Sequence, residues 1–190
     1  MKKLITVFGP SDVIPDSPLY KEAELLGVLL AQSGFNIVNG GYDGIMEAVS
    51  KGARANGAGV IAITAEVYSA RGREANAFIS REVKVKSAVD RLMELIDLSD
   101  ACVAIGVSPG TLLEVITVWD YTLKRFIDKR PVILVGEEWD RLGNCFDDED
   151  SMSHHRESFA YVHNARAAIA ILEQHFGKQE KLPELDVMTS

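Results

Sequence analysis

Two glycine-rich turns in this chain have the residue types needed to hold a phosphate group. The first, Gly40–Gly44, follows the apolar run Phe35–Val38, and the second, Gly106–Thr111, follows the apolar run Ala101–Ile105. A strand, a glycine turn and a helix start can bind phosphate, because glycine lets the backbone approach the ligand and the helix N-terminus offers unpaired N–H groups. For either turn by itself, the glycines could instead serve only the geometry of a strand-to-helix turn.

The turns belong to an alternation of apolar runs and helical patterns. Strands are predicted at Leu4–Phe8, Phe35–Val38, Val60–Ile63, Ala101–Ile105, Pro131–Val135 and Phe159–Val162. Helices are predicted at 17–33, 44–56, 83–98, 109–127 and 164–176. This alternation predicts an α/β fold, in which right-handed crossovers build a parallel sheet flanked by helices on both faces. Ligands of such sheets bind beyond the carboxyl ends of the strands, where both glycine turns fall.

Length and composition indicate one globular unit. The chain has 190 residues, of which 47% are hydrophobic and 25% charged, so we expect a single domain at 1–178 and a mobile tail at 179–190. The net charge of −8 argues against a general affinity for nucleic acid or anionic membranes. No apolar run approaches the roughly 20 residues of a membrane span, and the N-terminal run is too short for a signal peptide, which predicts a cytoplasmic protein.

The cysteine and histidine pattern predicts no metal site. Cys102 and Cys145 form no CxxC pair, and His154 and His155 lie in an acidic stretch typical of a solvated loop. Adjacent histidines rarely converge on one metal ion, so we expect none to be bound there.

Three motifs together resemble the Lonely Guy (LOG) family. They are Val7–Ser11, Gly40–Ala48 and Gly110–Glu114, and the likeness runs in order across about residues 3 to 172. The resemblance implies a Rossmann-like fold and a homodimer. It also implies a nucleoside 5′-monophosphate phosphoribohydrolase, which cuts the N-glycosidic bond of a cytokinin or purine nucleotide. The products are the free base and ribose 5-phosphate, and the family uses no metal or redox cofactor.

The resemblance assigns roles to particular residues. It implies that Arg91 and Glu114 are catalytic, since a carboxylate can stabilise an oxocarbenium-like sugar or activate water, while an arginine orients the sugar phosphate. The loop Arg71–Asn76 resembles a segment that borders the site. The residues expected to contact the substrate are Ser11, Gly40, Gly41, Gly44, Met46, Gly110 and Thr111.

The second loop departs from the family pattern Pro-Gly-Gly-x-Gly-Thr. This chain has Gly106, Val107 and Ser108 in the first three positions and Pro109 in the variable one, so one possible N–H donor to phosphate is missing. In the first loop, Tyr42 replaces a glycine that the family usually carries. These departures favour a second hypothesis, a non-catalytic nucleotide-binding or sensor protein. A third is a degenerate member retained for its dimer surface.

Structural alternatives compete with the catalytic roles. Glu114 completes a Thr111-x-x-Glu114 capping box, while Ser108 followed by Pro109 is a second conventional helix start. Arg91 is also compatible with a solvated helix position paired to neighbouring acids. Ser11 fits either a helix cap or a polar contact in the crevice.

Overall fold

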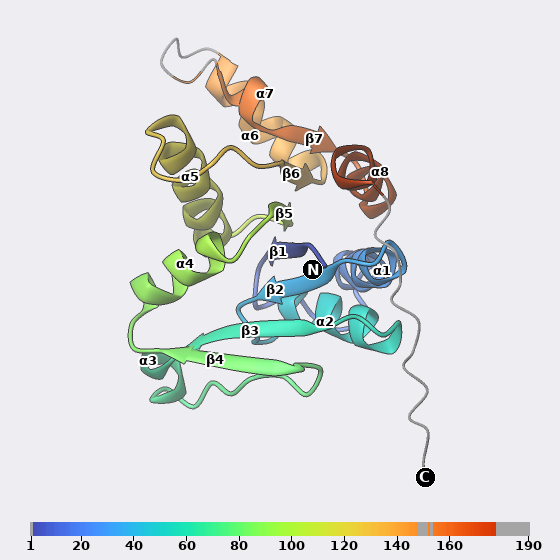
Figure 1. The fold of residues 1–190 in the computed structure, drawn as a ribbon, viewed down its shortest axis with the longest axis vertical. Helices are drawn as coiled ribbons and strands as arrows, with labels where there is room; N and C mark the ends of the chain where they lie inside the picture. Colours follow the sequence, from blue (N-terminus) through green and yellow to red (C-terminus); the bar gives the residue numbers. More distant parts are fainter. Residues whose placement is uncertain (1, 148–151, 153, 178–190) are drawn as a thin grey trace.

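A seven-stranded parallel sheet forms the centre of the molecule (Figure 1). The computed structural model describes residues 2–147, 152 and 154–177. Its strands follow the order β4-β3-β2-β1-β5-β6-β7, and every neighbouring pair is parallel. They are β1 (Leu4–Phe8), β2 (Asn36–Asn39), β3 (Val60–Ala65), β4 (Arg81–Val85), β5 (Ala101–Ile105), β6 (Val132–Val135) and β7 (Ala160–Val162).

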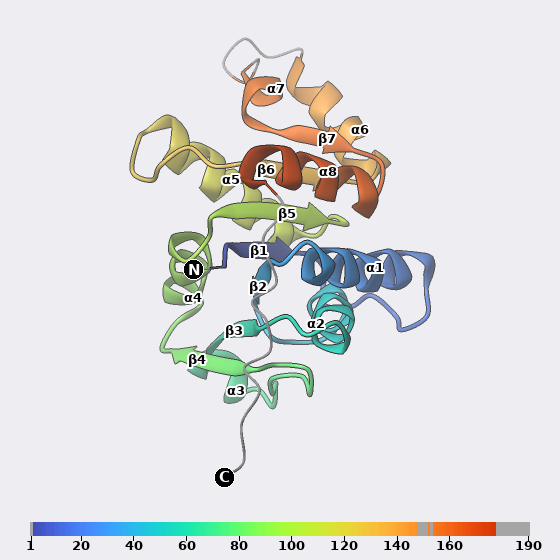
Figure 2. The same cartoon turned by 45° about the vertical axis from the view of Figure 1, so that its right-hand side comes forward.

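Helices cover both faces of the sheet, which confirms the predicted fold class. They are α1 (Pro18–Gln32), α2 (Ile45–Ala55), α3 (Glu66–Ser69), α4 (Ala88–Asp97), α5 (Pro109–Leu123), α6 (Glu137–Asp147), α7 (His155–Ser158) and α8 (Ala165–Phe176). Buried side chains of α1, α2 and α8 form one core, and those of α4, α5 and α6 form the other. Figure 2 shows α1 and α2 on the face opposite α4. Strands buried on both faces explain the continuous apolar runs.

The predicted helix at 83–98 is wrong in its first part. Residues Arg81–Val85 form the edge strand β4, and α4 begins only at Ala88. Ser87 is the N-cap of α4 and forms a capping box with Asp90, a local signal that marks the true start. The strand was missed because it is short and half exposed, and because Val85 falls by coincidence on the helical stripe. Helix α6 was not predicted either.

The strand order places the point of reversal between β1 and β5. The chain runs from β1 outward to β4 and then returns to the other side of β1 as β5. The connections that leave β1 and β5 therefore diverge, which opens a crevice at their carboxyl ends. This crevice holds both the loop that contains Ser11 and the second glycine turn.

Helices α1 and α2 pack at backbone distance through two glycines. A methyl group on Gly27 would overlap the carbonyl of Val49, and one on Gly52 would overlap the carbonyl of Glu24. Neither backbone can yield without separating the two helices, so the pair depends on the absence of a side chain at both positions.

We expect Gly27→Ala to destabilise the protein by about 1–3 kcal/mol, because the added methyl group overpacks a rigid backbone contact. Urea denaturation measures the change. Gly110→Ala is the control, since its methyl group would meet only the Ser108 hydroxyl at 3.9 Å. Equal stability of the two variants would contradict the assignment of Gly27 to close packing.

Several expectations concern the polar segments. The tail predicted at 179–190 lies outside the described residues. The solvated position predicted for His155 is wrong: this side chain is fully buried, and its ring nitrogens contact the Tyr161 hydroxyl at 2.7 Å and the Asp147 carboxylate at 2.8 Å. Among the described helices, none combines the length and apolar character needed to cross a bilayer.

Candidate functional site

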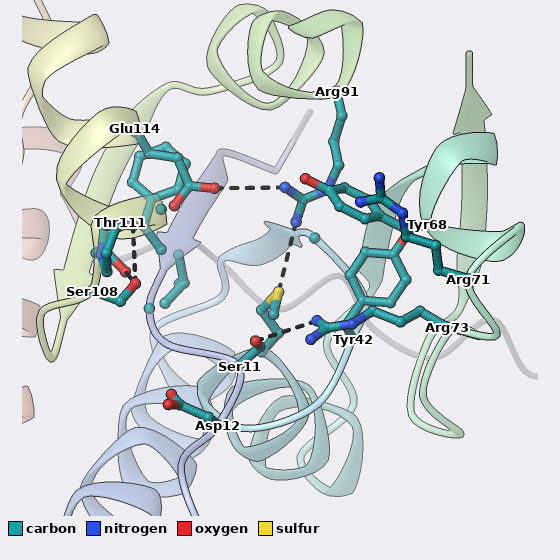
Figure 3. Close-up of a pocket in the computed structure, with 17 residues that line it drawn as sticks. Ser11, Asp12, Tyr42, Tyr68, Arg71, Arg73, Arg91, Ser108, Thr111 and Glu114 are labelled. Atoms are coloured by element: carbon teal, nitrogen blue, oxygen red, sulfur yellow. Dashed lines mark hydrogen bonds and ion pairs between the residues drawn. The ribbon is translucent and has the colours of Figure 1, made fainter. Parts of the chain in front are cut away.

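A cleft of about 590 Å³ lies at the carboxyl ends of the strands, next to the β1–β5 reversal (Figure 3). Connections following β1, β2, β3 and β5 contribute to its walls, together with α4. Seven of the predicted site residues line it: Ser11, Gly40, Met46, Arg91, Gly110, Thr111 and Glu114. Residues from distant parts of the sequence therefore meet at the sheet edge where ligands of α/β proteins bind.

Gly41 and Gly44 lie beside the cleft and are not part of its lining. Both adopt positive φ angles, 76° and 65°. A side chain on Gly41 would press on the Ala62 methyl group at 2.5 Å, and one on Gly44 would press on the Pro10 carbonyl at 2.5 Å. The Ile45 N–H, at the start of α2, donates to the same Pro10 carbonyl at 3.0 Å. At these two positions glycine therefore serves the turn and its packing.

The side chains of Arg91 and Glu114 meet at the cleft. An Arg91 Nη1 atom lies 3.7 Å from the Glu114 Oε1 atom, and the two side chains are only 12% and 14% exposed. Figure 3 shows them pointing toward each other from α4 and α5. The solvated alternative for Arg91 is excluded by this burial.

Arg91 is fixed by contacts on several sides. Its Nε donates to the Ile63 carbonyl at 2.9 Å, and its Nη2 donates to the Met46 sulfur, 3.8 Å away. The guanidinium also lies over the rings of Tyr42 and Tyr68, at 5.5 and 5.7 Å from their centres. These contacts hold the positive charge in one position, as an arginine that orients a ligand requires.

Gly40 leaves room for this arginine. A methyl group at Gly40 would overlap the Arg91 guanidinium and approach the Met46 sulfur to 2.8 Å. The first glycine turn therefore acts on the site through steric access, in addition to lining the cleft.

Burial raises the pKa of Glu114 to about 7, from its ordinary value of 4.5, and the positive charge of Arg91 opposes this rise. Desolvation penalises the carboxylate more than one nearby arginine restores it. At neutral pH the carboxyl group is thus divided between its acid and base forms. Such a group can accept a proton or release one without a large cost.

This shift predicts a pH-dependent stability difference. The folded protein keeps the Glu114 proton between pH 4.5 and 7, where the unfolded chain loses it. Its contribution to the free energy of unfolding falls as pH rises through this window and is constant above it. Glutamine does not ionise, so Glu114→Gln avoids this loss of stability. We expect its free energy of unfolding to equal that of the wild type at pH 4 and to be up to about 3 kcal/mol larger at pH 8. A difference independent of pH in urea denaturation would contradict the shift.

The start of α5 shows which cap is used. Ser108 is the N-cap and accepts from the Thr111 N–H at 3.2 Å, while Pro109 is the first helical residue. Glu114 is therefore not needed for capping and is available to Arg91. The Thr111 hydroxyl contacts the Ser108 hydroxyl at 2.8 Å and is buried. Gly110 is the remaining early position whose N–H has no intrahelical acceptor.

Sequence reasoning missed part of the cleft. Tyr68, on α3, and Asp12, after β1, both line it. Arg71 and Arg73 line it too, as the resemblance of their loop to a site-bordering segment implies. A usable signal was the position of Tyr68, just after a strand and three residues before Arg71.

Among the described residues, no group of three or more acidic, histidine or cysteine side chains is placed to hold a metal ion.

Comparison with known proteins places this arrangement in a family. The sequence model of the SLOG cluster4 family matches residues 2–169. The chain belongs to this family. An uncharacterised protein of Archaeoglobus fulgidus is 29% identical over 121 residues, which cover 64% of this chain and 78% of that protein.

Several solved structures share the fold of this chain over most of its length. The molybdenum cofactor binding protein of Rippkaea orientalis has a TM-score of 0.74 at 22% identity, covering 92% of this chain and 98% of its own. The structure called TM1055 has a TM-score of 0.72 at 29% identity, with 90% and 99% covered. The Chlamydomonas Moco carrier protein has a TM-score of 0.66 at 25% identity, covering 92% of this chain and 97% of its own. The Rossmann-like fold is thereby confirmed, while membership of the LOG family in particular stays a prediction.

One partner expectation is wrong. DNA processing protein A of Helicobacter pylori, described by its single-stranded DNA binding mode, shares this fold with a TM-score of 0.57 at 13% identity, covering 91% of this chain and 81% of its own. The net charge of the chain was therefore not a valid reason to exclude nucleic acid as a partner. A total charge does not report the local charge of a binding surface. At this identity the likeness shows the fold alone. The homodimer stays a prediction.

Proposed function

We propose that the cleft binds a nucleoside 5′-monophosphate, of cytokinin or purine type, and hydrolyses its N-glycosidic bond. The observation that carries this proposal is the Arg91–Glu114 pair, which is nearly buried in a cleft that two further arginines line. A volume of about 590 Å³ is suited to a ligand of nucleotide size. The LOG resemblance supports the same reaction.

In the proposed reaction, the bond between C1′ of the ribose and the base nitrogen breaks as positive charge develops on the sugar. The carboxylate form of Glu114 stabilises this charge and takes a proton from the attacking water, whose oxygen forms the new bond to C1′. The base leaves with the bonding electron pair and gains a proton. Arg91 holds the Glu114 carboxylate in place and offsets the negative charge of the phosphate.

A second candidate is binding without turnover. It is favoured by the α5 start, where Pro109 lacks an N–H and the Thr111 N–H is already bonded to Ser108. The similar structures from Rippkaea and Chlamydomonas carry names that refer to the molybdenum cofactor. By analogy, the molybdenum cofactor is the ligand to test for this alternative.

The deciding experiment incubates the purified protein with a panel of nucleoside 5′-monophosphates. Chromatography follows free base, and a coupled assay follows ribose 5-phosphate. We expect both products in equal amounts, and the fastest substrate identifies the base. Glu137→Gln serves as a control, since Glu137 is exposed and does not line the cleft.

Binding is measured on the same panel by the shift in thermal unfolding. Stabilisation by nucleotides without product would refute hydrolysis and support the binding candidate. Stabilisation by a molybdenum cofactor preparation alone would identify that cofactor as the ligand. Absence of both product and stabilisation would refute both candidates.

A further inference from the structure

Two arginines at the cleft have no ionic partner among the described residues. Arg71 and Arg73 are exposed and line the cleft, and neither forms an ion pair within the part of the chain that the structure describes. In a chain of net charge −8, carboxylates are abundant, so unpaired arginines gathered at one cleft are notable. They supply positive charge to the cleft.

A compact turn holds the two arginines in place. The backbone N–H groups of Arg71 and Arg73 both donate to the Tyr68 carbonyl, at 3.0 and 3.1 Å. Gly72 between them has a φ of 78°, which allows the tight reversal. Asn76 ties the end of the loop to the first glycine turn, because its side chain donates to the carbonyls of Gly41 and Tyr42 at 3.0 and 2.9 Å. The segment is therefore built onto the site.

The turn reaches across the mouth of the cleft. Arg73 Nη1 donates to the Ser11 hydroxyl at 3.3 Å, which links the connection after β3 with the connection after β1. Figure 3 shows Arg71 and Arg73 on the side of Tyr68, with Asp12 lying away from Arg71.

The opposite wall offers fewer donors. At the start of α5, Pro109 has no N–H, and the Thr111 N–H is satisfied by Ser108. A helix start binds phosphate mainly through such N–H groups. With only Gly110 left in the first positions, this helix start is a poor cradle for a doubly charged group.

We propose that Arg71 and Arg73, with the Ser11 hydroxyl, bind the terminal phosphomonoester of the ligand and take over the role that the altered second loop has lost. This inference rests on the proposed function for the identity of the ligand, but it makes no use of turnover. Guanidinium groups bind phosphate oxygens in pairs, and two of them match the charge of one phosphomonoester. The phosphate lies at the cleft mouth, and the sugar extends toward Arg91 and Glu114.

The test measures binding by calorimetry in a Glu114→Gln background, so that little substrate is consumed during a titration. Adenosine 5′-monophosphate, adenosine and inorganic phosphate are titrated into this protein and into its Arg71→Ala and Arg73→Ala forms. We expect each arginine variant to bind the monophosphate about 10- to 100-fold more weakly, since each loses hydrogen bonds to a charged group. Adenosine affinity should stay within twofold, and inorganic phosphate should follow the monophosphate.

Arg81→Ala is the matched control, because Arg81 is an exposed arginine on β4 that does not line the cleft. Thermal unfolding checks that every variant is folded, and a double Arg71→Lys, Arg73→Lys form keeps the charge but not the paired hydrogen bonds. Monophosphate affinity within twofold of the parent in both alanine variants would overturn the inference. So would equal losses for adenosine and its monophosphate.

A single-stranded oligonucleotide without terminal phosphates forms the last arm. Binding as tight as that of the monophosphate, with the same dependence on Arg71 and Arg73, would overturn the assignment to a phosphomonoester. The inference and the proposed function fail separately. If the wild type releases base but the arginine variants bind the monophosphate as tightly as their parent, only the inference is refuted. If binding depends on the phosphate but no base is released, only hydrolysis is refuted.

Discussion

Glu114→Gln is expected to lower kcat for nucleotide hydrolysis by about 10²- to 10⁴-fold, the range that a positioned general base contributes. Glutamine keeps the size of the side chain but can neither accept a proton nor carry negative charge. Its effect on nucleotide affinity should be small, because the carboxylate acts on the sugar and water and does not hold the phosphate. The measurement is kcat and KM on the best substrate of the panel.

The pH profile gives this prediction its sharpest form. Because burial raises the pKa of Glu114 to about 7, the base form grows as pH rises, and kcat/KM of the wild type should increase with a midpoint near 7. The residual activity of Glu114→Gln should lack this midpoint. Glu137→Gln should keep both the rate and the profile. A glutamine variant with wild-type turnover would remove Glu114 from the chemistry.

Arg91→Ala is expected to reduce kcat/KM by at least about 10²-fold and to move its pH midpoint upward. The positive charge of Arg91 lowers the pKa of Glu114, so its removal leaves a buried carboxyl group that ionises only at higher pH. The rate loss should therefore be largest near neutral pH and partly recover in alkaline buffer. A structural role alone would lower the rate without moving the midpoint.

Arg91→Lys separates charge from geometry. Lysine keeps the positive charge, but its compact ammonium group cannot donate to the Ile63 carbonyl and lie over Tyr42 and Tyr68 as the planar guanidinium does. We expect the midpoint to stay near that of the wild type while the rate remains reduced. A lysine variant with the alanine profile would show that charge at this position does not set the pKa of Glu114.

Much of the architecture was predictable from local patterns. Apolar runs separated by helical periodicity located six of the seven strands, since each pattern depends on residues within a few positions of one another. Ser108 followed by Pro109 correctly marked the start of α5 for the same reason. Strand β4 escaped because an edge strand buries little apolar surface, so its sequence lacks the continuous run of its neighbours.

The sequence by itself determined the alternation of strands and helices, the two glycine turns and the candidate pair of an arginine and a glutamate. Only the tertiary structure decided that Arg91 and Glu114 lie 3.7 Å apart and nearly buried, and that Arg71 and Arg73 join them at one cleft. The reason is physical. Periodicity and capping are local, whereas desolvation and ion pairing depend on atoms brought together by strands that are distant in the chain.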